Sequence, residues 1–494
     1  MELAPPRPVE QAPLPGAAEA PPRRRAAFPA HRYFLILAVF GLFAAFVLPI
    51  TYAVDAIGVG LLLVGLPVAG LVLWRPEFGL YVIVLYVPFE YFGIIGGDVA
   101  TLTKVIGIFT VVALLMHLVA TGRWEVRSVG LWLALAFAGW STLSVIGTFD
   151  PAYAWNRALT RIQMVGLVFV VLNACWTREQ TRALLIALFL AAVLAAIGAL
   201  VLPQPIEETA GIRRTLGTQG TNAHAKDLLP GLLLLPWIVS VTARRWLKAL
   251  VVLGAFVVLV DLVWTGSRSN YAALLAGVVV GVLAYSRISL ARRVRLVVAV
   301  VLILGVVIGL VALTGIWEER LWERVEWIWE RGLGEGGRLE LWSHAIAMGF
   351  EHPFMGVGVG QFGYALLTRL SFKAGAMAVH NDLLTHFAET GIPGLLLYLG
   401  FLVAVAASVW CTASLKLRSC VLALVVAAFV ASMANPSYAL KSWWLAMGLG
   451  LLIGRRFRSP PAPEQSHECL TGRRNARAVT LGTNPDIVSR RARS

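Results

Sequence analysis

The chain has 494 residues, of which 58% are hydrophobic and only 14% are charged. Soluble domains carry about 25% charged residues, so a soluble fold of this length could not bury so much apolar surface. The composition excludes a soluble protein and predicts an all-α polytopic membrane protein. The net charge of +15 is typical of basic residues collecting on the cytoplasmic side of a membrane, and we expect no nucleic-acid partner.

Apolar segments long enough to cross a bilayer, which requires roughly 20 residues, recur along the chain. We predict about 12–14 transmembrane helices, arranged as an N-terminal bundle over residues 33–313 and a C-terminal group over 391–454. The candidate spans are 33–50, 54–73, 78–96, 104–120, 129–147, 158–175, 183–202, 228–243, 249–265, 269–286, 296–313, 391–411, 420–435 and 441–454. Residues 1–32 and 455–494 predict disordered cytoplasmic tails, the first of them basic, and residues 314–390 predict a large, partly helical periplasmic loop.

Basic residues indicate the orientation, because they collect in cytoplasmic loops. With both termini in the cytoplasm, the short inner loops contain Arg75, Arg123, Arg127, Arg178, Arg182, Arg244, Arg245, Lys248, Arg287, Arg292, Arg293, Arg295, Lys416 and Arg418. Four basic residues break this pattern on the outer side: Arg213, Arg214 and Lys226 in "EETAGIRRTLGTQGTNAHAK", and Arg268 in "WTGSRSN". Near lipid headgroups, the binding of an anion is a common reason for such arginines.

The predicted outer loop opens with "IWEERLWERVEWIWER". Trp317, Leu321, Val325 and Ile328 fall on one helical face, which predicts either a helix lying in the membrane interface or an ordinary amphipathic helix packed on the loop. Further along, "GVGQFG" matches G-x-G-x-x-G but lacks the βαβ context of a dinucleotide site. We interpret its glycines as a turn that lets backbone N–H groups approach a ligand or another helix.

The most polar segment of the loop is "AVHNDLLTHFAETG", Ala378 to Gly391. His380 stands where a loop leads into a helix, and a histidine in that position can act as a general base near neutral pH. Asn381 or Asp382 could cap the helix, and we expect His386 to be packed or to cap. Asp382 and His386 share a helical face but His380 is out of register with them, so we expect no metal site.

Three arginines are predicted to lie outside and close to the membrane: Arg214, Arg268 and Arg338. Each alone could be a surface or snorkelling arginine. Guanidinium groups bind phosphate oxygens in a bidentate manner and keep a permanent charge. Together the three arginines suit a lipid-linked diphosphate.

The sequence resembles the O-antigen ligase and polymerase superfamily of bacterial envelope proteins in four ordered segments between residue 214 and about residue 400. They are "RTLGTQGTN", similar to an Arg-x-x-Gly-Thr loop ending in Asn; "GSRSNYAALLAG", similar to a Ser-Arg at the start of a span; "GRLELWSHAIAMGFEHPFMGVGVGQF", similar to an Arg…Trp…His-Pro…Gly-x-Gly-x-x-Phe stretch; and "VHNDLLTHFAETGIPGLLLYL", similar to a His-Asn…Glu-x-Gly-x-x-Gly segment. The first departs from the family, because Thr221 stands where a proline usually precedes the asparagine.

This resemblance implies a glycosyltransferase of the bacterial inner membrane whose active site faces the periplasm. Its donor would be a polyprenyl-diphosphate-linked glycan held among membrane lipids. The acceptor would be lipid A core for a ligase, another carrier-linked glycan for a polymerase, or a protein for a protein-glycosylating relative. We expect no cofactor, because diphosphate is already a competent leaving group where arginines offset its charge.

The resemblance also implies roles for single residues. His380 would be the general base, Arg214 and Arg268 match the phosphate-binding arginines, and Arg338 matches a recurrent arginine of the outer loop. Asn381 would orient His380 or cap its helix, and Glu389 would brace that helix. Direct attack of the acceptor oxygen on the anomeric carbon would invert its configuration.

An envelope transporter or flippase is the alternative reading of a polytopic chain. Transporters often show inverted repeats and charges at the membrane midplane, and the chain shows no convincing repeat. Asp261 is the clearest ionisable residue within a predicted span. It could be a proton site or a partner for a nearby arginine such as Arg268.

Overall fold

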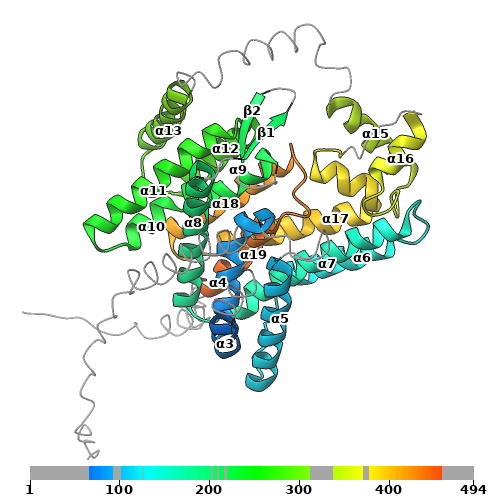
Figure 1. The fold of residues 1–494 in the computed structure, drawn as a ribbon, viewed down its shortest axis with the longest axis horizontal. Coiled ribbons are helices and arrows are strands. Elements are labelled where there is room, and N and C mark those ends of the chain that lie inside the picture. Colours follow the sequence, from blue (N-terminus) through cyan, green and yellow to red (C-terminus); the bar gives the residue numbers. More distant parts are fainter. Residues whose placement is uncertain are drawn as a thin grey trace, which may run out of the picture.

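The computed structural model describes residues 66–92, 102–125, 127–201, 204–208, 211–215, 220–311, 338–370 and 378–458. This part of the chain is a bundle of helices with one short β-hairpin (Figure 1). Eight of its helices are long and apolar enough to cross a membrane, and two shorter apolar helices accompany them. The predicted all-α polytopic membrane fold is confirmed.

The helices of the first half are α3 (Leu66–Trp74), α4 (Pro76–Tyr86), the 3-10 helix η2 (Val87–Phe92), α5 (Leu102–Thr121), α6 (Val129–Leu143), α7 (Pro151–Ala174) and α8 (Arg178–Val201). The hairpin follows, with β1 (Gln204–Glu208) antiparallel to β2 (Gly211–Thr215). The sequence pattern predicted no strand there, because a short two-stranded hairpin has too little apolar alternation to be recognised.

The second half contains α9 (Thr221–Leu233), α10 (Leu235–Val241), α11 (Arg245–Trp264), α12 (Arg268–Ala284), α13 (Leu290–Val311), α15 (Arg338–Glu351), α16 (Phe362–Leu370), α17 (Asp382–Trp410), α18 (Leu415–Ser432) and α19 (Lys441–Arg456). The short helices α15 and α16 fall in the predicted outer loop, which is therefore partly helical. The first predicted span and the predicted interfacial helix lie outside the described residues.

Several helices begin earlier than the predicted spans, and two of these differences matter for the site. Helix α7 starts at Pro151 because the carboxylate of Asp150 accepts a hydrogen bond from the backbone N–H of Tyr153, 2.9 Å away, and caps the helix. Helix α9 starts at Thr221 instead of residue 228, so Lys226 is a buried residue of a helix, not of the outer loop as predicted. The sequence did not reveal the true start of α9, because its first residues are mostly polar and a hydropathy pattern detects only the apolar part of a helix.

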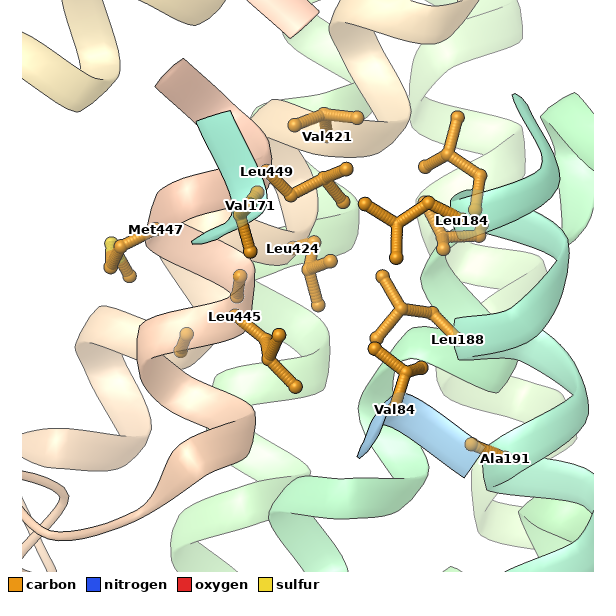
Figure 2. Close-up of a cluster of buried hydrophobic side chains, with 14 of the residues drawn as sticks. Val84, Val171, Leu184, Leu188, Ala191, Val421, Leu424, Leu445, Met447 and Leu449 are labelled. Carbon is orange, nitrogen blue, oxygen red and sulfur yellow. The ribbon is translucent and has the colours of Figure 1, made fainter. Parts of the chain in front are cut away.

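The core lies where α4, α7, α8, α18 and α19 meet. Figure 2 shows aliphatic side chains from all five helices converging there. Every labelled residue is buried: Val84, Val171, Leu184, Leu188, Ala191, Val421, Leu424, Leu445, Met447 and Leu449. Because lipid is as apolar as these side chains, close packing rather than hydrophobicity holds the helices together.

Helices α12 and α18 pack closely through small residues. Gly277 and Gly281 form a G-x-x-x-G pair on α12, and a Cβ at Gly277 would lie 2.6 Å from the carbonyl oxygen of Ala423 on α18. Small residues at this spacing let two helix backbones approach. The start of α12 and the end of α18 are thereby held at the same end of the bundle.

Candidate active site

His380 lies directly before α17 and is the one non-glycine residue with positive φ, 57°, among those described. Asn381 follows as the N-cap of α17, and its side-chain oxygen accepts a hydrogen bond from the N–H of Leu384 at 3.2 Å. The sequence left two candidate N-cap residues, Asn381 and Asp382, and the structure shows that Asn381 is the N-cap. The indole of Trp342 on α15 donates to the carbonyl of Val379 at 3.0 Å, which anchors the chain on the other side of the histidine.

The imidazole of His380 is half-buried, and its Nδ1 has no hydrogen-bond partner among the described residues. Burial lowers the pKa of His380 below its ordinary value, and the positive charges of Arg338 and Lys226 lower it further. The ring is therefore neutral near pH 7. A neutral imidazole can accept a proton.

Arg338 begins α15 and Arg268 begins α12, and both side chains are exposed. Partial burial and then the positive charge of Arg268 lower the pKa of Arg338, so the two guanidinium groups are within electrostatic range of each other. Neither forms an ion pair with a carboxylate among the described residues. Of the four principal predicted residues, Arg338 thus acts electrostatically on His380, and Arg268 acts electrostatically on Arg338.

The fourth, Arg214, lies on β2, which contacts α9 and α11. Its backbone pairs with Pro205 in the hairpin. The described structure does not place its side chain relative to the other two arginines.

Lys226 stood out in the sequence only for its charge, and the structure places it among the polar contacts of the site. Its Nζ donates hydrogen bonds to the carbonyls of Asn435 and Pro436, at 3.0 and 3.2 Å, and to the hydroxyl of Ser437, at 2.6 Å. The backbone N–H of Ser437 in turn donates to both carboxylate oxygens of Asp382, at 3.0 and 3.2 Å. The turn at residues 435–437 therefore ties α9 to the first residue of α17.

A second set of hydrogen bonds joins the starts of α9 and α12 to the same turn. The hydroxyl of Ser267 donates to the side-chain oxygen of Asn222 at 2.6 Å, and Asn222 donates to Asn435 at 3.1 Å. Asn435 then donates to the hydroxyl of Ser269 at 2.8 Å. These contacts hold Arg268 in the neighbourhood of the turn.

Three helices thus begin around one point: α9, α12 and α17. Neither Gly220 nor Ser267, the N-cap residues of α9 and α12, makes a side-chain cap hydrogen bond. The N-terminus of a helix carries partial positive charge on its unsatisfied N–H groups and binds anions. The region therefore combines helix N-termini, two guanidinium groups and a buried ammonium group around a neutral histidine.

Helix α17 is broken at Gly391, which has φ 68° and ψ −167°. The break leaves carbonyl groups without helical partners, and the glycine-rich loop supplies donors: the N–H of Val357 bonds to the carbonyl of Ala388 at 2.9 Å, and that of Gly358 to the carbonyl of Glu389 at 3.1 Å. The glycines of "GVGQFG" and its preceding residues thus approach another helix. This is one of the two roles that the sequence left open.

Glu389 lies two residues before the break at Gly391, near the end of the first segment of α17, and is buried. Its carboxylate pairs with the buried guanidinium of Arg161 on α7, 2.7 Å away, and Arg161 also donates to the hydroxyl of Ser141 on α6 at 2.9 Å. Glu389 therefore connects α17 to two neighbouring helices. The sequence alone did not predict Arg161 as its partner.

The structure corrects the expected partner of Asp261 and agrees with the expected packing of His386. The prediction that Asp261 could pair with Arg268 is wrong: its partner is His224 on α9, with 2.8 Å between the two side chains. His386 is packed, as expected, against the rings of Phe137 and Tyr398 at 4.9 and 4.3 Å. Among the described residues, no three His, Cys, Asp or Glu side chains gather as a metal site would require.

Comparison with known families agrees with these observations. Residues 252–399 match the family model described as O-antigen ligase. The matched range contains Arg268, Arg338, His380, Asn381 and Glu389, and the resemblance to the O-antigen ligase superfamily is confirmed. No curated protein matches the chain. The match and the apolar helices support a multi-pass bacterial membrane protein of a glycosyl-transferring ligase or polymerase type.

Proposed function

We propose that this protein transfers a glycan from a polyprenyl-diphosphate carrier to an acceptor on the periplasmic face of the inner membrane, with His380 as general base. The observation that carries the proposal is the position of His380. The half-buried imidazole of His380, whose pKa is lowered by burial and then by Arg338, stands where α9, α12 and α17 begin, and Arg268 acts electrostatically on Arg338. An O-antigen ligase match covers this region.

The diphosphate of the donor would bind to the positive charges. Arg268 and Arg338 offer planar forks that match phosphate oxygens, and the N-termini of α9 and α12 add backbone donors. We assign Arg214 to the same group because it stands in the matching loop of the family. Charge held in place around the leaving group stabilises the diphosphate as its bond to the sugar breaks.

His380 would take the proton of an acceptor hydroxyl while the oxygen attacks the anomeric carbon of the donor. A new C–O glycosidic bond forms, and the bond between that carbon and the diphosphate oxygen breaks with its electron pair leaving on the diphosphate. A positioned general base contributes about 10²–10⁴-fold to such a step. A single displacement of this kind inverts the anomeric centre.

Asn381, Asp382 and Glu389 would position the base. Asn381 caps α17, Asp382 binds the 435–437 turn, and Glu389 holds the first segment of α17 against Arg161. A base must stay within hydrogen-bond reach of its proton, so these contacts serve the reaction without touching the substrate.

The proposal is tested by a transfer assay with purified protein in liposomes. The donor is an undecaprenyl-diphosphate-linked glycan, the acceptors are lipid A core and a second carrier-linked glycan, and EDTA is present throughout. We expect His380→Ala to fold and to lose transfer by about 10²–10⁴-fold, whereas His117→Ala, which changes an exposed histidine of α5, keeps it.

The productive acceptor distinguishes a ligase from a polymerase. A product that retains the configuration of the donor would exclude the single displacement. Full activity of a folded His380→Ala protein would exclude His380 as the base.

A further inference from the structure

A buried histidine–aspartate pair lies close to the turn that leads into Arg268, and the proposed chemistry does not use it. Nε2 of His224 on α9 and Oδ2 of Asp261 on α11 are 2.8 Å apart, and both side chains are fully buried. An ionisable residue inside an apolar helix bundle is costly to bury and is a candidate for a functional role. The hydrogen bonds that lead from this pair to Arg268 indicate what that role is.

Helix α11 ends directly after Asp261 in a compact turn, residues 265–267, which is buried throughout. The backbone N–H of Thr265 donates to the carbonyl of Asp261 at 3.0 Å. Gly266 follows with φ 62°, a left-handed conformation that suits glycine at the end of a helix. The N–H of Ser267 then donates to Oγ1 of Thr265 at 3.3 Å. The course of the turn is therefore set by hydrogen bonds from Asp261 onward.

The same turn is joined to α9 at a second point. The hydroxyl of Ser267 donates to Oδ1 of Asn222 at 2.6 Å. The amide of Asn270 donates to the hydroxyl of Ser267 at 2.8 Å and to the backbone carbonyl of Asn222 at 3.2 Å. Asn222 lies two residues before His224, so the contacts close a circuit through α9, α11 and the turn. We call its members the polar clamp: Asn222, His224, Asp261, Thr265 and Ser267.

Arg268 directly follows the polar clamp and is the first residue of α12. Its side chain is exposed, whereas residues 265–267 before it and Asn270 after it are buried. One turn into α12, the hydroxyl of Tyr271 donates to the carbonyl of Val263 on α11 at 2.7 Å. The backbone is therefore held on both sides of Arg268, and its guanidinium projects from a fixed base.

A fixed base matters for a group that binds phosphate. A guanidinium binds phosphate oxygens through two parallel N–H bonds, so its direction counts as well as its distance. Binding is weakened by the free energy needed to order a mobile loop or side chain, and order that exists beforehand avoids that loss. The polar clamp can act in this way without touching the ligand.

We propose that the polar clamp positions Arg268 for the diphosphate of the donor, with His224 and Asp261 as positioning residues. This inference rests on the proposed function, since Arg268 binds the diphosphate there. It predicts a loss of diphosphate affinity that passes through Arg268 and is measurable without turnover.

The test measures the Kd of undecaprenyl diphosphate by titration of the full-length protein in detergent. Ser267→Ala removes two hydrogen bonds of the polar clamp and should raise this Kd by about two- to tenfold. His224→Leu should raise it over the same range, and His224→Gln should restore it, because its amide can still donate to Asp261. Should the unpaired Asp261 carboxylate prevent His224→Leu from folding, Ser267→Ala still gives the measurement.

A double-mutant cycle with Arg268→Ala decides whether the polar clamp acts through Arg268. Arg268→Ala alone should raise the Kd, and adding Ser267→Ala should raise it no further, because the residue to be positioned is absent. The positioning role is overturned if Ser267→Ala has the same effect with and without Arg268, or if Arg268→Ala leaves the Kd unchanged. A folded His224→Gln protein that binds as weakly as His224→Leu would also overturn it.

Thr242→Val is the matched control. It removes a buried hydroxyl that donates to the carbonyl of Ile238 at 2.8 Å, at the opposite end of α11 from Asp261. Its Kd for undecaprenyl diphosphate should equal that of the parent protein. A loss as large as that of Ser267→Ala would show a general loss of structure and would overturn the positioning role.

The transfer assay separates this inference from the proposed function. In a parent protein that transfers glycan, Ser267→Ala should raise the KM for the donor, and an unchanged donor KM would overturn the inference alone. Diphosphate binding that depends on both Ser267 and Arg268, in a parent protein that transfers no glycan to any acceptor, would overturn the proposed function and keep the polar clamp.

Discussion

Arg161 of α7 and Glu389 of α17 form an ion pair with 2.7 Å between Nη2 and Oε2, and both side chains are buried. The pair stands two residues before the break of α17 at Gly391. Burying two charges costs much of what their attraction returns, so the pair does little for stability as a whole. The pair instead fixes the position of the short helical segment that begins at Asp382, directly after His380 and the N-cap Asn381.

Removing one partner should therefore be far more costly than removing both. Glu389→Gln or Arg161→Met leaves a buried charge without its partner and should destabilise the protein by about 3–5 kcal/mol. The double variant should recover much of that loss. Thermal unfolding in detergent, followed by size-exclusion chromatography, measures these differences.

The control for this pair is Glu351→Gln, because Glu351 pairs with Arg369 at the surface. Exposed pairs contribute about 0–1 kcal/mol, so the melting temperature should change little. Equal losses for the buried and the exposed pair would contradict the role assigned to Arg161 and Glu389.

The pH dependence of transfer should report the surroundings of His380. Burial, then Arg338, then Lys226 lower its pKa from 6.5. The base works when neutral, so activity should be lost only as the pH falls through that lowered pKa. Arg338→Gln removes one positive charge, raises the pKa of His380 and should move the acid limb of the kcat profile to higher pH.

Arg369→Gln is the matched control, since it removes an exposed arginine of α16 that pairs with Glu351. Its profile of kcat against pH, measured with both substrates saturating, should overlay that of the parent protein. An acid limb that stays in place for Arg338→Gln would show that Arg338 does not act on the titrating group.

Lys226 should matter for turnover through the turn that it holds. Lys226→Met removes three hydrogen bonds to residues 435–437 and leaves the carboxylate of Asp382 without its nearby positive charge. A displacement of about 1 Å in a reacting group can cost on the order of 10²-fold in rate, so we expect kcat to fall on that scale.

Asp382→Asn is the milder change, because an amide oxygen can still accept the hydrogen bond from Ser437. Its kcat should fall less than that of Lys226→Met, with the KM for the donor unchanged in both. If Lys226→Met raised the donor KM and kept kcat, Lys226 would be a substrate-binding residue instead.

The break in α17 should not tolerate a side chain. At Gly391, φ is 68° and ψ is −167°, a backbone region that is essentially restricted to glycine, and a Cβ there would lie 2.4 Å from the carbonyl oxygen of Phe354. Gly391→Ala should therefore destabilise the protein by roughly 1–3 kcal/mol from backbone strain alone.

Gly400→Ala on the same helix is the control. A Cβ at Gly400 meets its nearest atom at 3.5 Å, an ordinary contact, and alanine is the better helix former. Thermal unfolding should show a melting temperature that is unchanged or higher for Gly400→Ala and clearly lower for Gly391→Ala. Equal behaviour of the two variants would mean that the break is not strained.

Composition and local patterns in the sequence are sufficient to predict the class of the protein and the position of several candidate site residues along the chain. Composition alone excluded a soluble fold, since no packing arrangement can bury that much apolar surface in water. The polar run from Ala378 to Gly391 stood out against its apolar surroundings, and it contains both His380 and the N-cap of α17. Composition and local polarity are properties of the sequence itself, so they can be detected without knowledge of the fold.

Only the tertiary structure decided which residues meet. Asp261 pairs with His224 and not with an arginine, Glu389 pairs with Arg161, and Lys226 binds a turn some 200 residues away. The first two pairs each join two helices and the third joins a helix to a turn, and the apolar faces of these helices do not identify their neighbours. The partner of a buried polar group is set by how the helices pack, because each such group must find a hydrogen-bond partner at the contact that packing provides.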